Sequence, residues 1–229
     1  MEVDERIATG LREHFAAFRE ADEADGGRLG FKIAFNPPAV QAHLGLPYSL
    51  VAGLRRRVRH SGGPHSLAGG TRIALEAEVA VELGRDLAAD ASEADGAGAL
   101  ESVMPAIEVV DLDRPFDALA EILRDGVFQR AVAFGDPTPA PPDGRIAGVV
   151  ARILHNDREL ARLDAEIATG EIPSLLLHVA RLIEPHGLAL RAGDRLILGS
   201  MAPPVEPTPG DRFELTLEGI GSVALDFVA

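Results

Sequence analysis

The chain has 229 residues, with 22 basic and 36 acidic side chains and a formal net charge of −14. This acidic balance argues against a nucleic-acid-binding protein, because such proteins normally present a basic surface. The absence of cysteine excludes disulfides, thiolate metal sites and cysteine nucleophiles. No apolar run approaches the roughly 18 residues of a membrane-spanning helix, and the first residues lack the features of a signal peptide. We therefore expect a cytoplasmic protein with no nucleic-acid or membrane partner.

The N-terminal region carries apolar residues at helical spacing. Ile7, Leu11, Phe15 and Phe18 share one face, which predicts a helix over residues 3–22. We expect residues 1–28 to form an N-terminal helical segment and residues 29–229 to form one domain.

The next segment, residues 29–35, alternates as a strand. Phe31 and Ile33 share one face, and Lys32 points to the other. Lys32 is the one lysine among 22 basic residues. A lysine can shift its pKa and transfer a proton, whereas an arginine effectively cannot. Lys32 is therefore a candidate for proton transfer, and a lysine left by chance is the alternative.

A short helix is predicted over residues 39–44, with His43 on the surface, and a compact basic run follows over residues 55–60. Two interpretations of the basic run stay open. It is either a solvated loop that balances an acidic body, or a flap that offers an arginine to an anionic substrate.

The central stretch, residues 73–83, alternates without a break. Its odd positions are all apolar, while Glu76, Glu78 and Glu82 occupy the even face. This period of two predicts a strand. Glu76 and Glu78 lie roughly 7 Å apart along such a strand, so their repulsion must be offset by water or by a cation. The alternatives are a half-solvated strand and a divalent-metal site that needs a third carboxylate.

A third carboxylate occurs in the apolar run over residues 103–111, which predicts a strand interrupted by Glu108. A buried, unpaired charge is very costly. Glu108 must therefore lie on a wet face or bind a partner.

The remaining chain alternates short strands with a few helices. We expect a loop or short helix over 84–98, helices over 116–123 and 173–185, a proline-rich loop over 137–144, a turn over 155–158 and strands over 131–134, 148–154, 195–200, 213–217 and after 223. His178 is expected on the flank of the helix over 173–185. This succession predicts an α+β fold dominated by a rolled β-sheet.

Five segments, in this order, resemble the fumarylacetoacetate hydrolase superfamily, and within it the 2-keto-4-pentenoate hydratase and 4-oxalocrotonate decarboxylase branch. The resemblance implies a mixed β-sandwich or roll with flanking helices. The segments that carry it are Gly30-Phe31-Lys32-Ile33, Leu75-Glu76-Ala77-Glu78-Val79-Ala80, Ala106-Ile107-Glu108-Val109-Val110-Asp111, Ala192-Gly193-Asp194 with Leu198-Gly199-Ser200, and Gly219-Ile220-Gly221-Ser222-Val223.

The resemblance implies a Mg²⁺ or Mn²⁺ site built from Glu76, Glu78 and Glu108, with Glu82 left out. A 2-oxo acid would chelate the metal through its carboxylate and keto oxygens, and the metal would stabilise the enolate. Lys32 would contact the substrate carboxylate or assist proton transfer, and Ser200 would bind substrate. The implied activity is that of a metal-dependent hydratase, a hydro-lyase acting on a small 2-oxo acid such as 2-keto-4-pentenoate, in a homo-oligomer.

The sequence departs from this branch in residues 47–53, which lack the aspartate that the family links to proton transfer. Four alternatives therefore stay open. They are an oxo-acid decarboxylase, a hydrolase that cleaves a C–C bond in an acylpyruvate, a non-catalytic metal or oxo-acid binding protein, and a structural subunit with solvated glutamates.

Overall fold

The computed structural model describes residues 4–24, 27–60 and 63–229. The helices are α1 Glu5–Ala24, α2 Pro38–Leu44, η1 Arg56–Val58, α3 Glu93–Ala99, α4 Leu119–Arg124, α5 Ala165–Thr169, α6 Ile172–Ile183 and η2 Glu184–His186. The strands are β1 Arg28–Ala34, β2 Leu50–Arg55, β3 His65–Ser66, β4 Ile73–Leu83, β5 Leu100–Asp111, β6 Gln129–Phe134, β7 Thr138–Pro139, β8 Val150–His155, β9 Arg158–Asp164, β10 Arg195–Ser200, β11 Arg212–Leu217 and β12 Gly221–Val228. The predicted α+β class with a rolled sheet is confirmed.

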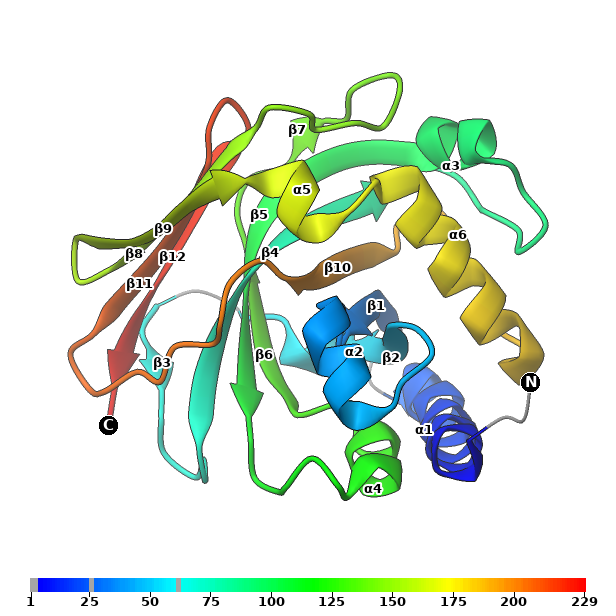
Figure 1. The fold of residues 1–229 in the computed structure, drawn as a ribbon, viewed down its shortest axis with the longest axis horizontal. Coiled ribbons are helices and arrows are strands. Elements are labelled where there is room, and N and C mark those ends of the chain that lie inside the picture. Colours follow the sequence, from blue (N-terminus) through cyan, green and yellow to red (C-terminus); the bar gives the residue numbers. More distant parts are fainter. Residues whose placement is uncertain (1–3, 25–26, 61–62) are drawn as a thin grey trace.

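The first sheet has the strand order β2-β1-β10-β4-β5-β6, with β7 paired to β5. It curls strongly in the centre of the molecule (Figure 1). The segment that follows β2 then pairs with β6, since Arg59 bridges Val132 and the His60 backbone N–H donates to the Val132 carbonyl at 2.8 Å. The sheet thereby closes into a small barrel.

This closure corrects both interpretations of the basic run over 55–60. The run is neither a solvated loop nor a flap, because it forms the end of β2, the turn η1 and the bridge to β6. The guanidinium of Arg55 reaches the Ala17 carbonyl and that of Arg56 reaches the Arg28 carbonyl, each at 3.4 Å.

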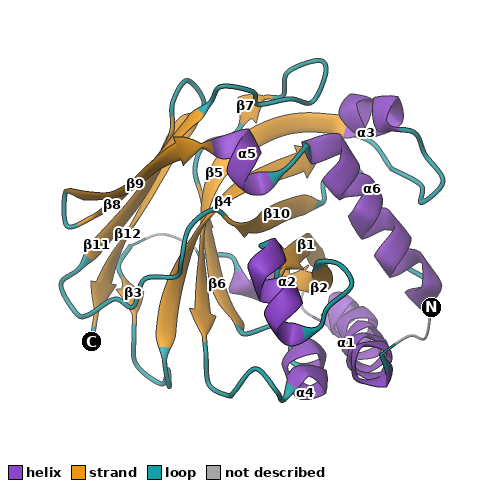
Figure 2. Cartoon of the chain, in the orientation of Figure 1, coloured by secondary structure: helices purple, strands orange, loops and turns teal. Residues whose placement is uncertain are grey.

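The second sheet has the order β3-β12-β11-β8-β9. It packs on one side of the barrel through β11, β12 and β5, while α1 and α6 cover the opposite side (Figures 1 and 2). The turn predicted over 155–158 joins β8 to β9. Strand β9 was not predicted, because its sequence is mostly charged and it lies at the edge of the sheet.

The helix predicted over residues 3–22 is α1, which begins at Glu5 and ends at Ala24; Asp4 precedes it, and Val3 lies outside the described residues. Phe15 and Phe18 contact Phe31 of β1, with ring centroids 6.5 and 5.9 Å apart. These side chains belong to the main hydrophobic core. The division of the chain at residue 28 stays a prediction.

Strand β4 lies between β10 and β5. Its odd face joins the main core, as predicted, through residues such as Val79 and Leu83. Its even face points into the barrel, where Ala80 packs with Met104 and Ile197 in a second, smaller cluster. The alternative prediction of a half-solvated strand is therefore wrong, since both faces of β4 are largely buried.

Within the described residues, no helix combines the length and the apolar character that crossing a membrane would require.

Candidate metal and substrate site

The three predicted glutamates converge because of the register between two antiparallel strands. Glu76 of β4 pairs directly with Glu108 of β5, and Glu78 stands two residues further along β4 on the same face. One carboxylate oxygen from each of the three lies within 4.8 Å of the others. Glu76 is partly exposed, while Glu78 and Glu108 are each 1% exposed.

Lys32 reaches this cluster from a distant strand of the same sheet. Strand β1 is three places from β5 in the strand order, a separation of roughly 14 Å in a flat sheet. The Lys32 Nζ nevertheless donates to Glu108 Oε1 at 2.6 Å and to the Val127 carbonyl at 2.9 Å. The curl of the barrel makes this contact, and Lys32 is only 2% exposed.

The Val127 carbonyl is presented to Lys32 by an unusual backbone. Val127 and Phe128 have φ angles of 55° and 63°. This left-handed region is rare for bulky side chains, and it costs of order 1–3 kcal/mol per residue. Such strain persists only where surrounding packing enforces it, and here it lies directly beside the carboxylate cluster.

Two glycines shape the strands around the cluster, one at a bulge in β10 and one where β1 lies close to β10. Gly199 has a φ of 100° in a bulge of β10, and its backbone N–H donates to Glu78 Oε2 at 2.7 Å. Gly30 in β1 approaches β10 so closely that a Cβ would lie 1.8 Å from the Arg195 carbonyl oxygen. A glycine is therefore needed at each position.

The three glutamates of the cluster all have raised pKa values, because they are buried close together with Lys32 as their neighbouring cation. Burial, reinforced by the Glu108 carboxylate, raises the pKa of Glu76 to about 7. Burial and the two neighbouring carboxylates hold the pKa of Glu78 well above its usual range. Burial also raises the pKa of Glu108, although the Lys32 ammonium opposes this rise.

The donor set fits a hard divalent cation. Glu108 Oε2 is buried, and no hydrogen-bond partner for it occurs within the described parts of the chain. Converging carboxylate oxygens of this kind are the ligands that Mg²⁺, Mn²⁺ and Ca²⁺ prefer. Lys32 alone cannot neutralise three carboxylates.

A cavity of about 520 Å³ opens beside the cluster. Lys32, Asn36, Glu76 and Ser200 are its polar lining residues. Ser200 donates its hydroxyl proton to the Ala202 carbonyl at 2.7 Å, so its oxygen keeps lone pairs that can accept a hydrogen bond.

Asn36 was not predicted as a site residue. Its Nδ2 donates to the Thr169 carbonyl at 3.0 Å, and its Oδ1 accepts from the Ser49 hydroxyl at 3.2 Å. Ser49 lies in the 47–53 stretch that lacks the family's aspartate. A polar residue between the Lys32 strand and Pro37 was the available signal, because strand ends often carry functional groups.

The other side chains considered in the sequence lie apart from the cluster. Glu82, on the same face of β4, forms an ion pair with Arg195 at 2.8 Å. His43 is exposed, as predicted, and His178 contacts the Ser49 carbonyl at 2.8 Å. No described side chain of the 55–60 run lines the cavity.

A family model described as fumarylacetoacetate (FAA) hydrolase C-terminal matches residues 19–228. The 2-keto-4-pentenoate hydratase 1 of Dechloromonas aromatica (strain RCB) is 30% identical over 213 residues, a match that covers 89% of this chain and 80% of that protein.

Several solved structures share the fold, among them a decarboxylase and a hydrolase. The 4-oxalocrotonate decarboxylase from Pseudomonas putida G7, complexed with calcium and acetate, has a TM-score of 0.82 at 20% identity and covers 93% of this chain and 83% of its own. Fumarylpyruvate hydrolase from Pseudomonas aeruginosa, in complex with Mn²⁺ and pyruvate, has a TM-score of 0.72 at 14% identity. The match covers 86% of this chain and 88% of the hydrolase chain. The resemblance read from the sequence is confirmed, and the chain belongs to the fumarylacetoacetate hydrolase family.

Proposed function

We propose that this protein is a divalent-metal-dependent hydratase that adds water to a small 2-oxo acid such as 2-keto-4-pentenoate. The observation that carries the proposal is the convergence of Glu76, Glu78 and Glu108 beside Lys32 at the edge of a cavity. The activity named for the relative at 30% identity supports the same assignment.

In this proposal Glu76, Glu78 and Glu108 hold Mg²⁺ or Mn²⁺. The unpartnered Glu108 Oε2 and the raised pKa values of all three carboxylates support it, because each describes a site that lacks a cation. The bound metal would supply Lewis-acid polarisation of the keto oxygen of the substrate. The structure of the 4-oxalocrotonate decarboxylase is a complex with calcium, and that of the fumarylpyruvate hydrolase is a complex with Mn²⁺.

Lys32 is the proposed catalytic residue. Hydration of the dienol form adds the hydroxyl of water to C4 and protons to C3 and C5. One proton comes from the water and the other from the enol hydroxyl, which becomes the keto group, so the reaction needs a group that accepts and donates protons. The Lys32 ammonium is held at Glu108 and the Val127 carbonyl and lines the cavity, where it can deliver a proton or bind a carboxylate. Ser200 and Asn36 are the proposed hydrogen-bonding residues for the substrate's oxygens.

The test is a hydration assay with the dienol form of 2-keto-4-pentenoate. Hydration breaks the conjugation, so ultraviolet absorbance should fall only when Mg²⁺ or Mn²⁺ is present, and EDTA should stop the reaction. Products separate the alternatives, since a decarboxylase releases CO₂ from an oxalocrotonate and a hydrolase releases two acids from an acylpyruvate. Metal-dependent binding of oxalate without turnover of any of these would contradict the enzymatic assignment and favour the binding protein.

The missing aspartate in residues 47–53 is the observation that favours the binding protein. A homo-oligomeric assembly remains part of the proposal and rests on the family resemblance, while a cytoplasmic location remains the expectation drawn from the sequence.

A further inference from the structure

The lining of the cavity is mostly apolar. Its four polar residues are Lys32, Asn36, Glu76 and Ser200, of which Glu76 belongs to the carboxylate cluster and Lys32 contacts it. The other described lining residues are apolar, and they include Phe35, Phe116 and Phe128. A ligand held by the carboxylate cluster and Lys32 therefore has mostly hydrocarbon around the rest of its structure.

Three phenylalanines form a continuous aromatic wall. The ring centroids of Phe35 and Phe116 lie 6.2 Å apart, and those of Phe116 and Phe128 lie 5.8 Å apart, both in edge-to-face arrangements. Phe116 is 43% exposed, which is unusual for such a large apolar side chain. This wall leaves apolar surface uncovered at the cavity mouth.

The volume exceeds what a five-carbon acid needs. A cavity of about 520 Å³ lies in the range of about 300–1,000 Å³ typical of pockets that bury drug-sized ligands. A five-carbon 2-oxo acid has about eight non-hydrogen atoms, so it would leave much of the apolar wall in contact with water. Filling that space with hydrocarbon would release this water favourably.

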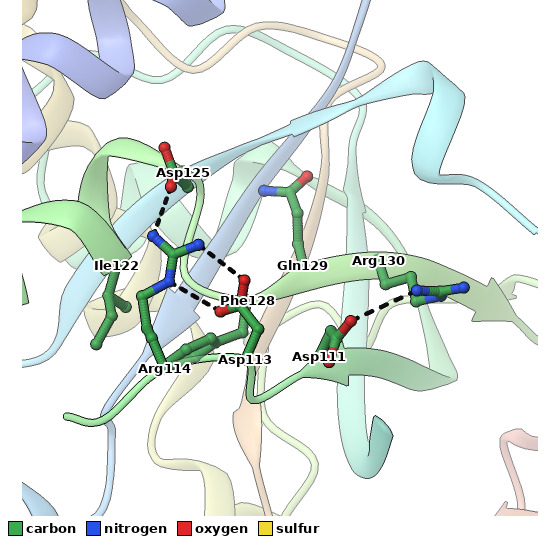
Figure 3. Close-up of a pocket in the computed structure, with 8 residues that line it drawn as sticks. All are labelled: Asp111, Asp113, Arg114, Ile122, Asp125, Phe128, Gln129 and Arg130. Carbon is green, nitrogen blue, oxygen red and sulfur yellow. Dashed lines mark hydrogen bonds and ion pairs between the residues drawn. The ribbon is translucent and has the colours of Figure 1, made fainter. Parts of the chain in front are cut away.

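The cavity also lacks a second cation for a second carboxylate. Lys32 is the one basic side chain among the described lining residues, and it already contacts Glu108 and the Val127 carbonyl. Arg114, which lies in the chain between Leu112 and Phe116, is held by Asp113 and Asp125 in a separate cavity (Figure 3).

Figure 3 also shows Arg130 directed to Asp111, at 3.5 Å, in that second cavity. Both arginines are thus paired with carboxylates in that cavity, and Phe128 is the one described residue that lines both cavities. A distal carboxylate in the first cavity would lose its hydration against the apolar wall and would find no arginine among the described lining residues, which is costly.

We propose that the substrate is a 2-oxo acid with a single carboxylate and an apolar tail of about six or more carbons, aryl or alkyl, that packs on Phe35, Phe116 and Phe128. This inference rests on the proposed function, since the metal end of the site must hold the 2-oxo acid group. It narrows that function by excluding dicarboxylic acids and by extending the tail beyond the vinyl group of 2-keto-4-pentenoate.

The experiment measures the dissociation constants of four 2-oxo acids on the Mg²⁺-loaded full chain by calorimetry. The probes are pyruvate, 2-oxooctanoate, 4-phenyl-2-oxobutanoate and 2-oxoadipate. We expect the two apolar acids to bind at least about tenfold more tightly than pyruvate, because each buried methylene adds to affinity. We expect 2-oxoadipate to bind no more tightly than pyruvate.

Phe116 supplies the variants. Phe116→Ala should reduce the tenfold advantage of 4-phenyl-2-oxobutanoate over pyruvate, while Phe116→Arg should tighten the binding of 2-oxoadipate. Ile167→Ala is the matched control, because Ile167 is 86% exposed and does not line the cavity.

The outcomes separate the two proposals. If pyruvate binds with Mg²⁺ but the apolar acids gain nothing over it, or 2-oxoadipate binds most tightly, the tail inference is wrong and the proposed function stands. If none of the four acids binds the Mg²⁺-loaded chain, the proposed function is wrong and the tail inference falls with it.

Discussion

Glu78 and Glu82 lie four residues apart on the same face of β4, and their surroundings are opposite. Glu78 is 1% exposed, lies beside two other carboxylates and accepts a hydrogen bond from the Gly199 N–H. The Glu82 side chain is 25% exposed and is neutralised by Arg195 at 2.8 Å. The Glu82 charge is thus paired with an arginine, whereas the Glu78 carboxylate is buried beside two other carboxylates.

Under the proposed function, this difference predicts that metal binding and stability depend on different residues of the same strand. A carboxylate that already has its arginine gains little from a cation, whereas a buried cluster with excess negative charge favours one. The opposite face of β4, with Leu83 fully buried in the main core, carries no charge and contributes packing. Substitutions at these three places should therefore have separable effects.

The largest effect is expected for Glu78→Gln. Losing a metal ligand removes several kcal/mol of transition-state stabilisation, so activity should fall by about 10³-fold. Thermal melts should show that Mg²⁺ no longer raises the melting temperature. The metal-free variant should melt no lower than metal-free wild type, because a buried charge has been removed. A normal Mg²⁺-induced shift in this variant would contradict the proposed ligand set.

Lys32→Met should reduce kcat by about 10² to 10⁴-fold, because a proton-transfer group is lost. The Mg²⁺-induced rise in melting temperature should remain, which distinguishes this role from metal binding. Lys32→Arg keeps the charge but cannot exchange a proton near neutral pH. Wild-type turnover in the arginine variant would show that Lys32 acts through charge alone.

Leu83→Ala tests the apolar face of β4. Truncating a fully buried leucine costs about 2–5 kcal/mol of unfolding free energy, measurable by urea denaturation. The activity per folded molecule and the Mg²⁺ response should be unchanged. A lost Mg²⁺ response would mean that the two faces of the strand are coupled.

His14 is a buried base, and its burial favours the neutral form of the imidazole. Its Nε2 accepts from the Gly53 N–H at 2.8 Å, and its Nδ1 lies 3.1 Å from the Arg124 carbonyl. Burial, with a smaller effect from the Arg55 and Lys32 charges, lowers its pKa from 6.5 to about 4. The folded protein therefore binds fewer protons than the unfolded chain below pH 6.5.

The stability contributed by neutral His14 is present above pH 6.5 and is lost as the pH falls towards 4, by about 3 kcal/mol in total. Denaturant unfolding of wild type and His14→Gln across this range should isolate the loss as the difference between the two curves. Parallel curves would show that His14 does not titrate in this way.

Much of the fold, and the residues of the candidate site, could be predicted because the signals are local. The period of two over residues 73–83 identified β4, and the cost of a lone buried charge singled out Glu108. The direct pairing of Glu76 with Glu108 could not be derived from these patterns, because register depends on strands far apart in the chain.

Other features had no local signal. The closure of the barrel by Arg59 and Val132 is a contact between distant segments, so the basic run was assigned to a loop or a flap. The left-handed conformation of Val127 and Phe128 contradicts their intrinsic preferences. Packing around the Lys32 contact enforces it, and packing cannot be read from residue type.

The smallest effect is expected for Glu82→Gln, the matched control for Glu78→Gln on the same face of the strand. Its ion pair with Arg195 is partly exposed, and such pairs contribute at most about 1 kcal/mol. The unfolding free energy should change by no more than this amount, and the Mg²⁺-induced shift and the hydration rate should match wild type. A loss of the Mg²⁺ response equal to that of Glu78→Gln would mean that the whole even face of β4 acts as one electrostatic unit. The separation between a compensated and an uncompensated glutamate would then be wrong.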